Sequence, residues 1–531
     1  MPASRLFDAN CVVGRHLVLG PGGPHTAADL LADMDRHGIA EALVIDSLAR
    51  ECHPAPGNKR ILEVAAASPR LHPAWAALPP GTEDEQPPPA DLVALMRKNG
   101  VGAIFLYPGQ YKFGLGDWCV DALVEPLAEV GVPVFINPND VGAGLPMRDQ
   151  TDWAGVVALC RRWPSLPVVV SEWRIRRSQR EIYRALDACP NLRIELSGYW
   201  LYRGVEYITS RWGAERLLFG SNWPTFNHAL TLAAVTMADV SDDDKRLILG
   251  DNLRRLLAWA EVERPEVEPV EPADEFVRFV RTGERPPDMS FLDAHGHLGG
   301  CMSHYHVPGG SVDETVCEMD RLGVEKTCVF SFAGVVSDEA YGNDVVADAC
   351  RRYPERFVGF TLVNLLRGRE AVLAELERGA RMGLRGVKLI GAYHGYPPEH
   401  PLTDNVCRWA NDRRAIVLNH NWGSPDGMER LLRTCPDACF ITGHSTTAYA
   451  ESMRRHSNLY VCTCPLLGSR TCEEFVERLG ADRLVFGSDL QDLPVSWGLG
   501  PVLAARISPA EKRLILGENL RRILERYSLK P

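Results

Sequence analysis

Two histidines separated by one residue form the most chemically suggestive pattern in this sequence. His295 and His297 end the apolar run Phe291–His297. On a β-strand, residues i and i+2 point to the same side, so both imidazoles can reach one point beyond the end of the strand. Imidazole is the side chain that binds metal ions most often, and this spacing therefore indicates a metal site. A pair of ordinary strand histidines would show the same spacing, so the rest of the chain has to decide between the two interpretations.

The run that carries this pair belongs to a regular alternation of strand-like and helix-like segments. Helical patterns such as Thr26–His37, Asp117–Val130 and Trp153–Arg162 separate short apolar runs. Eight such runs in each half predict two (β/α)8 barrels of about 250 residues each. In the first half we expect strands at Arg5–Cys11, Ala42–Ser47, Pro73–Leu78, Gly102–Pro108, Pro133–Pro138, Pro167–Trp173, Arg193–Ser197 and Leu217–Asn222, and in the second half at Phe291–His297, Lys326–Phe332, Phe357–Val363, Leu384–Ile390, Ala415–His420, Cys439–His444, Leu459–Cys464 and Arg483–Asp489.

The two halves are also similar as sequences. Arg216–Asn222 resembles Arg483–Asp489, and Lys245–Gly250 is identical to Lys512–Gly517. Both pairs are separated by 267 positions. Two matches at one offset indicate an internal duplication. We therefore expect a first barrel over residues 1–257, a second barrel over 290–531, and between them a connector over 258–289 that is rich in Glu and Pro and contains a short helix near 273–281.

Composition narrows the possible classes of function. The chain has 531 residues and a net charge of −11, which argues against nucleic acid or an anionic membrane as a partner. It contains no signal peptide and no apolar run long enough to span a bilayer. The 15 cysteines are an odd number in a long chain, so we expect reduced thiols in the cytoplasm.

Titratable residues occur at the ends of five of the eight expected strands in the second half. The active sites of (β/α)8 barrels lie at the carboxyl ends of the strands, called the rim below. A coincidence at five strands is improbable, which favours the metal-site interpretation. Besides His295 and His297, the residues are Lys388 in the run Leu384–Ile390, and His420, His444 and Asp489 at the ends of Ala415–His420, Cys439–His444 and Arg483–Asp489.

This arrangement resembles the amidohydrolase superfamily, in which strand 1 carries His-x-His, strands 5 and 6 carry His, and strand 8 carries Asp. The ending Phe-Gly-Ser-Asp at 486–489 and the pattern of Gly517, Asn519 and Arg522 resemble its amidohydrolase-related branch. That branch includes metal-dependent hydrolases, decarboxylases of aminocarboxymuconate semialdehyde and of resorcylates, and a hydratase. The resemblance covers both halves of the chain.

The resemblance implies that His295, His297, His420 and Asp489 hold one divalent ion, expected to be Zn²⁺, with no organic cofactor. It also implies that Asp489 is the general base and that His444 orients the water or stabilises the oxyanion. A metal ion lowers the pKa of its bound water and polarises a substrate oxygen.

Lys388 stands out because the chain has 8 lysines against 50 arginines. In binuclear members of the superfamily, a carboxylated lysine on strand 4 bridges two metals, and His420 and His444 would then hold the second ion. Alternatively, Lys388 pairs with a substrate carboxylate or only caps the rim, with one metal bound.

Several further residues have two interpretations. Cys462 and Cys464 would be zinc ligands or buried packing residues. His304 and His394, in loops after strands 1 and 4, would contact substrate or solvent. Trp422 would be a pocket wall or a packing residue.

The first half lacks the ligands of the second. Aligning the halves predicts that the six positions are replaced by residues that do not form this metal site, so the first barrel should be a pseudoenzyme without a catalytic ion. The resemblance to decarboxylases that receive an arginine from a partner subunit implies that the two barrels form an intramolecular pseudo-dimer, and it is compatible with a further homodimer. Arg174, Arg176 and Arg177 are the candidates for such a substrate-binding arginine, with a solvated basic loop as the alternative. The predicted replacements are Asn10 for His295, Val12 for His297, Ile104 for Lys388, Pro138 for His420, Glu172 for His444 and Asn222 for Asp489.

We therefore expect metal-dependent hydrolysis of an amide, imine-like or lactone bond of a small molecule in the second barrel. Non-oxidative decarboxylation of a small carboxylate on the same ligands is the main alternative. A third alternative is a non-catalytic binding protein that a metal stabilises, with Cys462 or Cys464 as an extra ligand.

Overall fold

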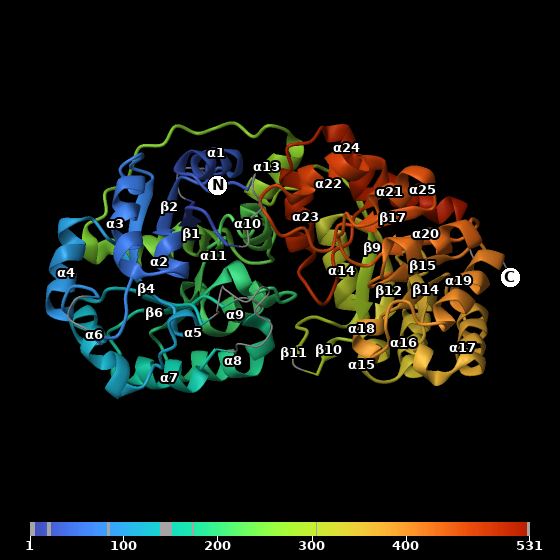
Figure 1. The fold of residues 1–531 in the computed structure, drawn as a ribbon, viewed down its shortest axis with the longest axis horizontal. Coiled ribbons are helices and arrows are strands. Elements are labelled where there is room, and N and C mark those ends of the chain that lie inside the picture. The colour runs from blue at the N-terminus through green and yellow to red at the C-terminus, as the bar shows by residue number, and fades with distance from the viewer. Residues whose placement is uncertain are drawn as a thin grey trace. The chain divides into compact units, whose positions relative to one another are not determined.

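The computed structural model describes residues 6–17, 23–81, 85–138, 151–172, 175–303 and 305–527, and the chain forms two compact units (Figure 1). In Figure 1 the first unit is coloured from blue to green and the second mainly from yellow to red. The first unit comprises Met1–Trp200, Gly204–Glu284 and Leu467–Ser469, and the second comprises Leu201–Arg203, Arg285–Leu466 and Arg470–Pro531.

Each unit contains one sheet of eight parallel strands, and neighbours in the chain are neighbours in the sheet. Backbone hydrogen bonds from Ala9 N to Phe219 O and from Ala294 N to Phe486 O connect the first and eighth strands, so both sheets close into barrels. The predicted fold of two tandem (β/α)8 barrels is confirmed. The strands are β1 Phe7–Val13, β2 Glu41–Asp46, β3 Leu71–Ala76, β4 Ala103–Leu106, β5 Val134–Ile136, β6 Val168–Val170, β7 Leu192–Glu195 and β8 Leu217–Leu218, and then β9 Phe291–Leu298, β12 Val324–Ser331, β13 Phe357–Leu362, β14 Gly386–Leu389, β15 Ile416–Asn419, β16 Cys439–Thr442, β17 Leu459–Cys462 and β18 Leu484–Val485.

Helices enclose each ring of strands (Figure 1). The first unit contains α1 Ala27–His37, α2 Ser47–Glu51, α3 Pro54–Ala65, α4 Pro89–Lys98, α5 Pro108–Tyr111, α6 Asp117–Val130, α7 Trp153–Arg162, α8 Gln179–Ala188, α9 Gly204–Trp212, α10 His228–Thr236, α11 Asp242–Arg246, α12 Asn252–Leu256 and α13 Glu275–Thr282. The second contains α14 Val312–Leu322, α15 Phe332–Val336, α16 Glu339–Arg352, α17 Arg369–Arg381, α18 Gly391–His394, α19 Leu402–Asp412, α20 Pro425–Thr434, α21 Ala450–Arg455, α22 Thr471–Leu479, α23 Val495–Ala504, α24 Pro509–Arg513 and α25 Asn519–Arg526.

The duplication is visible in how equivalent helices begin and end. Thr26 before α1 and Ser311 before α14 both form a capping box with an acidic residue three positions later. Both helices end at a glycine with a left-handed backbone, Gly38 at φ 70° and Gly323 at φ 78°. Local sequence therefore sets the same boundaries twice.

The eighth strand of each barrel is held in place by the helix that ends the repeat. A π-helical turn covers Leu247–Asp251 in the first repeat and Leu514–Glu518 in the second. Its carbonyls at Ile248 and Ile515 accept hydrogen bonds from the residues that follow β8 and β18, each at 2.9 Å. This contact fixes the chain just before the Asn222 and Asp489 positions.

The segment between the barrels contains the expected short helix, α13. Its residues Phe276, Val277, Phe279 and Val280 are buried, and the first compact unit extends through it to Glu284. A short hairpin of β10 (Cys301–Met302) and β11 (Tyr305–His306) follows β9, where we had expected only a loop. Among the described residues, no helix is both long and apolar enough to cross a membrane.

Candidate metal centre in the second barrel

Three of the four predicted metal ligands converge at the rim of the second barrel. The Nε2 atoms of His295 and His297 lie 3.3 Å and 2.9 Å from Oδ1 of Asp489. All three side chains are buried. Their ligand atoms lie within 4.8 Å of one another, which is the arrangement that a bound cation requires.

A carboxylate beneath these ligands fixes their backbone. Asp293 Oδ1 accepts hydrogen bonds from His295 N and Ser488 N, each at 3.0 Å, and Asp293 Oδ2 accepts from Ser488 Oγ at 2.5 Å. Asp489 follows with a left-handed backbone at φ 60°, and its N–H donates to His295 O at 2.9 Å. Asp and Asn are among the residues that tolerate this backbone region best. Asp293 therefore connects the ends of the first and eighth strands.

Hydrogen bonds determine which histidine nitrogens are available to a metal. His295 Nδ1 lies 2.8 Å from Gly443 O, and His444 Nδ1 lies 3.2 Å from Cys464 O. Because a carbonyl only accepts, both Nδ1 atoms carry the proton, and His295 Nε2 keeps its lone pair. His444 Nε2 must then accept from His420 Nδ1, 3.0 Å away, which leaves the lone pair of His420 on Nε2.

Burial favours the neutral imidazole form of His295 and His420. Burial, followed by the charge of Lys388, lowers the pKa of His295 well below its usual value. Burial and the neighbouring His444 lower the pKa of His420 to about 3. Burial alone would raise the pKa of Asp489, but the surrounding histidines hold it well below the usual value. The site thus combines neutral imidazole with ionised carboxylate, the protonation states that metal binding needs.

Lys388 is buried beside this site without a hydrogen-bond partner. Its Nζ lies 4.2 Å from the centroid of the Phe330 ring, a cation–π distance. Burial lowers its pKa to about 8. A buried ammonium without an acceptor costs free energy, so an anion from substrate or from carboxylation of the amine would stabilise this position.

The donor set fits a divalent metal. His295, His297 and Asp489 supply two nitrogens and one carboxylate oxygen, the chemistry that zinc prefers. His420, with its free Nε2 lone pair, would be the fourth protein ligand, although only the first three lie within 4.8 Å of one another in this structure. Metal binding at all four residues remains a prediction.

The other predicted site residues in the described part of the second barrel make different contacts. His394, the last residue of α18, has its Nε2 atom 3.0 Å from Gly334 O in α15. Trp422 is buried, packs edge-on against Phe440 and donates to Ile441 O at 3.2 Å, as expected of a packing residue. Cys462 and Cys464 are buried and are not among the three residues whose ligand atoms lie within 4.8 Å of one another at the rim.

The predicted arginine segment and His304 are described only in part. Arg174 and His304 lie outside the described residues, as does the side chain of Arg176. Arg177 lies in a 3-10 turn over Ile175–Ser178 of the first unit and is partly buried. Burial raises the pKa of Glu172 to about 7, and the positive charge of Arg177 partly offsets this rise.

Two predicted equivalences between the halves are wrong by one residue. Arg385 N bonds to Gly359 O as Gly102 N bonds to Pro73 O, so Lys388 corresponds to Phe105 and not to Ile104. His420 N bonds to Leu389 O as Asn137 N bonds to Leu106 O, so His420 corresponds to Asn137 and not to Pro138. Backbone pairing sets the register of strands 4 and 5, and the weak sequence similarity there did not reveal it.

In the first barrel, two residues equivalent to the candidate ligands form hydrogen bonds. Asn10 Nδ2 donates to Glu195 Oε2 at 3.1 Å and lies 3.2 Å from Ser171 Oγ. Arg50 Nη1 donates to Asn222 Oδ1 at 3.1 Å. Asn10 and Asn222, at the positions equivalent to His295 and Asp489, thus bind neighbouring polar side chains.

Sequence reasoning missed Asp293 and Ser488, which position the ligands. A buried aspartate inside the apolar run Phe291–His297 was a visible signal, because an unpaired carboxylate is rarely buried. The serine lies in the Phe-Gly-Ser-Asp ending, where only the aspartate had been given a role. Neither residue is a candidate ligand: Asp293 accepts from backbone N–H groups, and Ser488 donates to Asp293 through both its N–H and its hydroxyl.

The chain is a (β/α)8-barrel protein with a candidate metal site, and comparison with known proteins gives the family. The family model described as Amidohydrolase matches residues 23–259 and again 293–526, so the chain belongs to the amidohydrolase family. A search of curated proteins finds no match. Membership supports an enzyme whose chemistry depends on a metal.

Solved structures resemble this chain in fold alone. An uncharacterised TIM-barrel protein from Bordetella bronchiseptica is 17% identical over 45% of this chain and 99% of its own, with a TM-score of 0.37. A 2,6-dihydroxybenzoate decarboxylase from Rhizobium is 16% identical over 44% and 98%, with a TM-score of 0.34. A probable 2-pyrone-4,6-dicarboxylic acid hydrolase from Acinetobacter baumannii is 14% identical over 45% and 100%, with a TM-score of 0.34.

Proposed function

We propose that the second barrel is a metal-dependent hydrolase that cleaves an amide, imine-like or lactone bond of a small molecule. The observation that supports this function is the convergence of two histidine Nε2 atoms on the ionised carboxylate of Asp489. Bound at these residues and His420, a divalent ion, for which zinc is the best candidate, would supply Lewis-acid activation of water and of the substrate oxygen.

The chain's own residues then handle the proton. Asp489 accepts a proton from the attacking water, whose oxygen forms a bond to the carbonyl or imine carbon. The C–N or C–O bond breaks as Asp489 returns the proton to the leaving nitrogen or oxygen. Asp489 is available for this role because its low pKa keeps it ionised at neutral pH.

His444 has a positioning role in this arrangement. Its Nε2 accepts from His420, so the neutral ring has no further N–H for a substrate oxyanion. Burial lowers the pKa of His444, which disfavours a second proton. The predicted oxyanion role would require that the hydrogen bond to His420 break.

Lys388 favours decarboxylation as the second candidate function. Its buried Nζ lacks an acceptor, and a substrate carboxylate would provide one. In that reaction the C–C bond to the carboxylate breaks, CO₂ leaves, and a proton replaces it on carbon. No water attacks the substrate.

The fate of oxygen distinguishes these functions. The zinc-loaded full chain is incubated in ¹⁸O-water with a panel of lactones and cyclic amides, and separately with hydroxybenzoates. If the protein is a hydrolase, the product of a lactone or amide contains ¹⁸O and no CO₂ is released. Asp489→Asn should abolish this incorporation of ¹⁸O. Release of CO₂ from the hydroxybenzoates would instead support decarboxylation. Retention of zinc with no turnover of either class would favour a metal-stabilised binding protein.

A further inference from the structure

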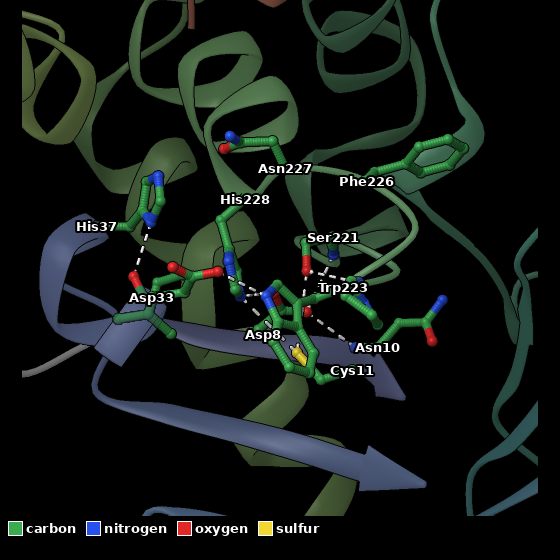
Figure 2. A network of polar contacts seen from close by, with 12 residues as sticks. Asp8, Asn10, Cys11, Asp33, His37, Ser221, Trp223, Phe226, Asn227 and His228 are labelled. Atoms are coloured by element: carbon green, nitrogen blue, oxygen red, sulfur yellow. Dashed lines mark hydrogen bonds and ion pairs between the residues drawn. The ribbon is translucent and has the colours of Figure 1, made fainter. Parts of the chain in front are cut away.

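A second convergence of ligand atoms lies in the first unit, between β1 and α10. Asp8 and Cys11 are on β1, and His228 is the first residue of α10. Figure 2 shows the imidazole of His228 pointing from α10 towards both side chains, while Asn10 points elsewhere. One ligand atom from each of Asp8, Cys11 and His228 lies within 4.8 Å of the other two.

The cluster is fully buried and its carboxylate is only half satisfied. Asp8 is 0% exposed, Cys11 0% and His228 1%. Asp8 Oδ1 accepts from Asn10 N at 2.9 Å and Ser221 N at 3.0 Å. Asp8 Oδ2 accepts no hydrogen bond and faces His228 Nε2 at 3.5 Å. A buried carboxylate oxygen without a donor is costly unless a cation compensates it.

The geometry is that of a metal site and not of a catalytic triad. In a triad the histidine contacts its carboxylate through one ring nitrogen and its nucleophile through the other. Here both groups approach the same nitrogen, because Cys11 Sγ lies 4.0 Å and Asp8 Oδ2 3.5 Å from His228 Nε2. Three donors that meet around one point are the arrangement around an ion.

The second barrel provides an internal comparison. At the 267-residue offset His228 corresponds to Val495, and along the first strand Asp8 and Cys11 correspond to Asp293 and Gly296. In that copy the equivalent Oδ2 accepts from Ser488 Oγ at 2.5 Å. The aspartate is therefore shared, whereas the thiol and the imidazole occur together only in the first copy.

We propose that Asp8, Cys11 and His228 form a buried structural site for a divalent metal ion, with zinc as the cation that suits one oxygen, one sulfur and one nitrogen. Ser221 Oγ, 3.9 Å from Cys11 Sγ, is placed to be a fourth ligand. On binding, Cys11 loses its thiol proton to solvent, as does any Asp8 still protonated, and His228 binds as neutral imidazole. Because no ligand is exposed, the ion stabilises the first barrel and does not meet substrate.

Burial raises the pKa of Asp8 to about 7 and the pKa of Cys11 well above its usual value. An ion that binds here must therefore displace the proton of the Cys11 thiol, and zinc binding should strengthen as the pH rises. The site is independent of the proposed hydrolase function, since none of its atoms belongs to the second barrel.

X-ray absorption at the zinc edge tests the proposal without altering the first barrel. The full chain carrying His295→Ala and His297→Ala, which removes the rim site, is purified from zinc-supplemented medium. We expect about one zinc per chain with a sulfur scatterer at about 2.3 Å. Absence of zinc from this variant, or a shell of nitrogen and oxygen only, would overturn the proposal.

Substitutions then identify the cysteine that supplies the sulfur ligand. In the same background, Cys11→Ser and His228→Val should each lose the zinc, and valine is the residue that the second copy carries there. Cys464→Ser is the matched control and should keep both the zinc and its sulfur signal. Loss of the signal in Cys464→Ser but not in Cys11→Ser would refute the site. Circular dichroism of each variant monitors the fold.

Discussion

At the scale of single residues, the positions of protons at the rim follow from two backbone carbonyls. Gly443 O accepts from His295 Nδ1 and Cys464 O accepts from His444 Nδ1, so both histidines keep the lone pair on Nε2. His444 Nε2 accepts from His420 Nδ1, so His420 also keeps its lone pair on Nε2. Residues that do not touch a metal commonly set the tautomer of those that do. His444 fits that role better than direct contact with a substrate oxyanion.

This view predicts the effect of changing His444. His444→Ala should weaken zinc binding about 10- to 100-fold, because His420 Nδ1–H loses its acceptor. His444→Gln, whose side-chain oxygen can accept the same bond, should restore much of the affinity. Competition with a chromophoric chelator measures both. An unchanged zinc affinity in His444→Ala together with a lower kcat would favour the oxyanion role.

The buried amine of Lys388 predicts a specific pH dependence of stability. Its pKa is about 8 in the fold against 10.5 when exposed, so between these values the unfolded chain binds a proton that the native chain does not. The contribution of Lys388 to the free energy of unfolding should therefore rise with pH across this window, by an amount on the order of 3 kcal/mol. Lys388→Met should abolish this rise. Denaturant unfolding of metal-free protein at pH 7, 8, 9 and 10 measures the difference, and parallel curves for both proteins would contradict it.

At the scale of elements, each barrel depends on how its first strand is joined to the end of its eighth. Sequence periodicity predicted all sixteen strands, because an apolar run between helical patterns has few other interpretations. It did not predict the pairing register of strands 4 and 5, where Phe105 and Asn137 occupy the positions assigned to neighbouring residues. It also did not predict the aspartate beneath the site, because Asp293 acts through backbone N–H groups.

The duplication supplies a matched pair of substitutions for this junction. Ser488→Ala removes a buried hydrogen bond to Asp293 Oδ2 and should destabilise the second barrel by about 1–3 kcal/mol while weakening zinc binding at Asp489. Ser221→Ala should cost less, because Asp8 Oδ2 accepts no hydrogen bond. Thermal unfolding of both variants without added metal makes the comparison. Equal losses of stability in the two variants would contradict this prediction and show that both serines stabilise their junctions to the same extent.

At the scale of the whole molecule, one fold occurs twice and its polar residues have diverged. The framework is retained in detail: Asn252 and Asn519 each donate to two carbonyls around strand 8, at 2.9 Å and at 2.8 Å. The ligand positions at the rim changed, as the sequence had indicated. The cluster of Asp8, Cys11 and His228 escaped sequence reasoning because Cys11 and His228 lie 217 positions apart and each alone is an ordinary core residue. The visible signal in the sequence is that Cys11 and His228 stand where the second half has Gly296 and Val495, neither of which can bind a metal through its side chain.

Two separate sites in two compact units predict that zinc acts on each barrel independently. A ligand that binds only the native state stabilises the elements it contacts, by about 4 kcal/mol at a thousand times its Kd. In hydrogen exchange followed by mass spectrometry, zinc should therefore protect peptides covering β1 and the start of α10, and also peptides covering β9 and the segment after β18. His295→Ala with His297→Ala should abolish only the second protection, and Cys11→Ser only the first. Protection confined to the second barrel would contradict the buried site at Asp8, whereas loss of both protections in either variant would show that the two barrels respond as one unit.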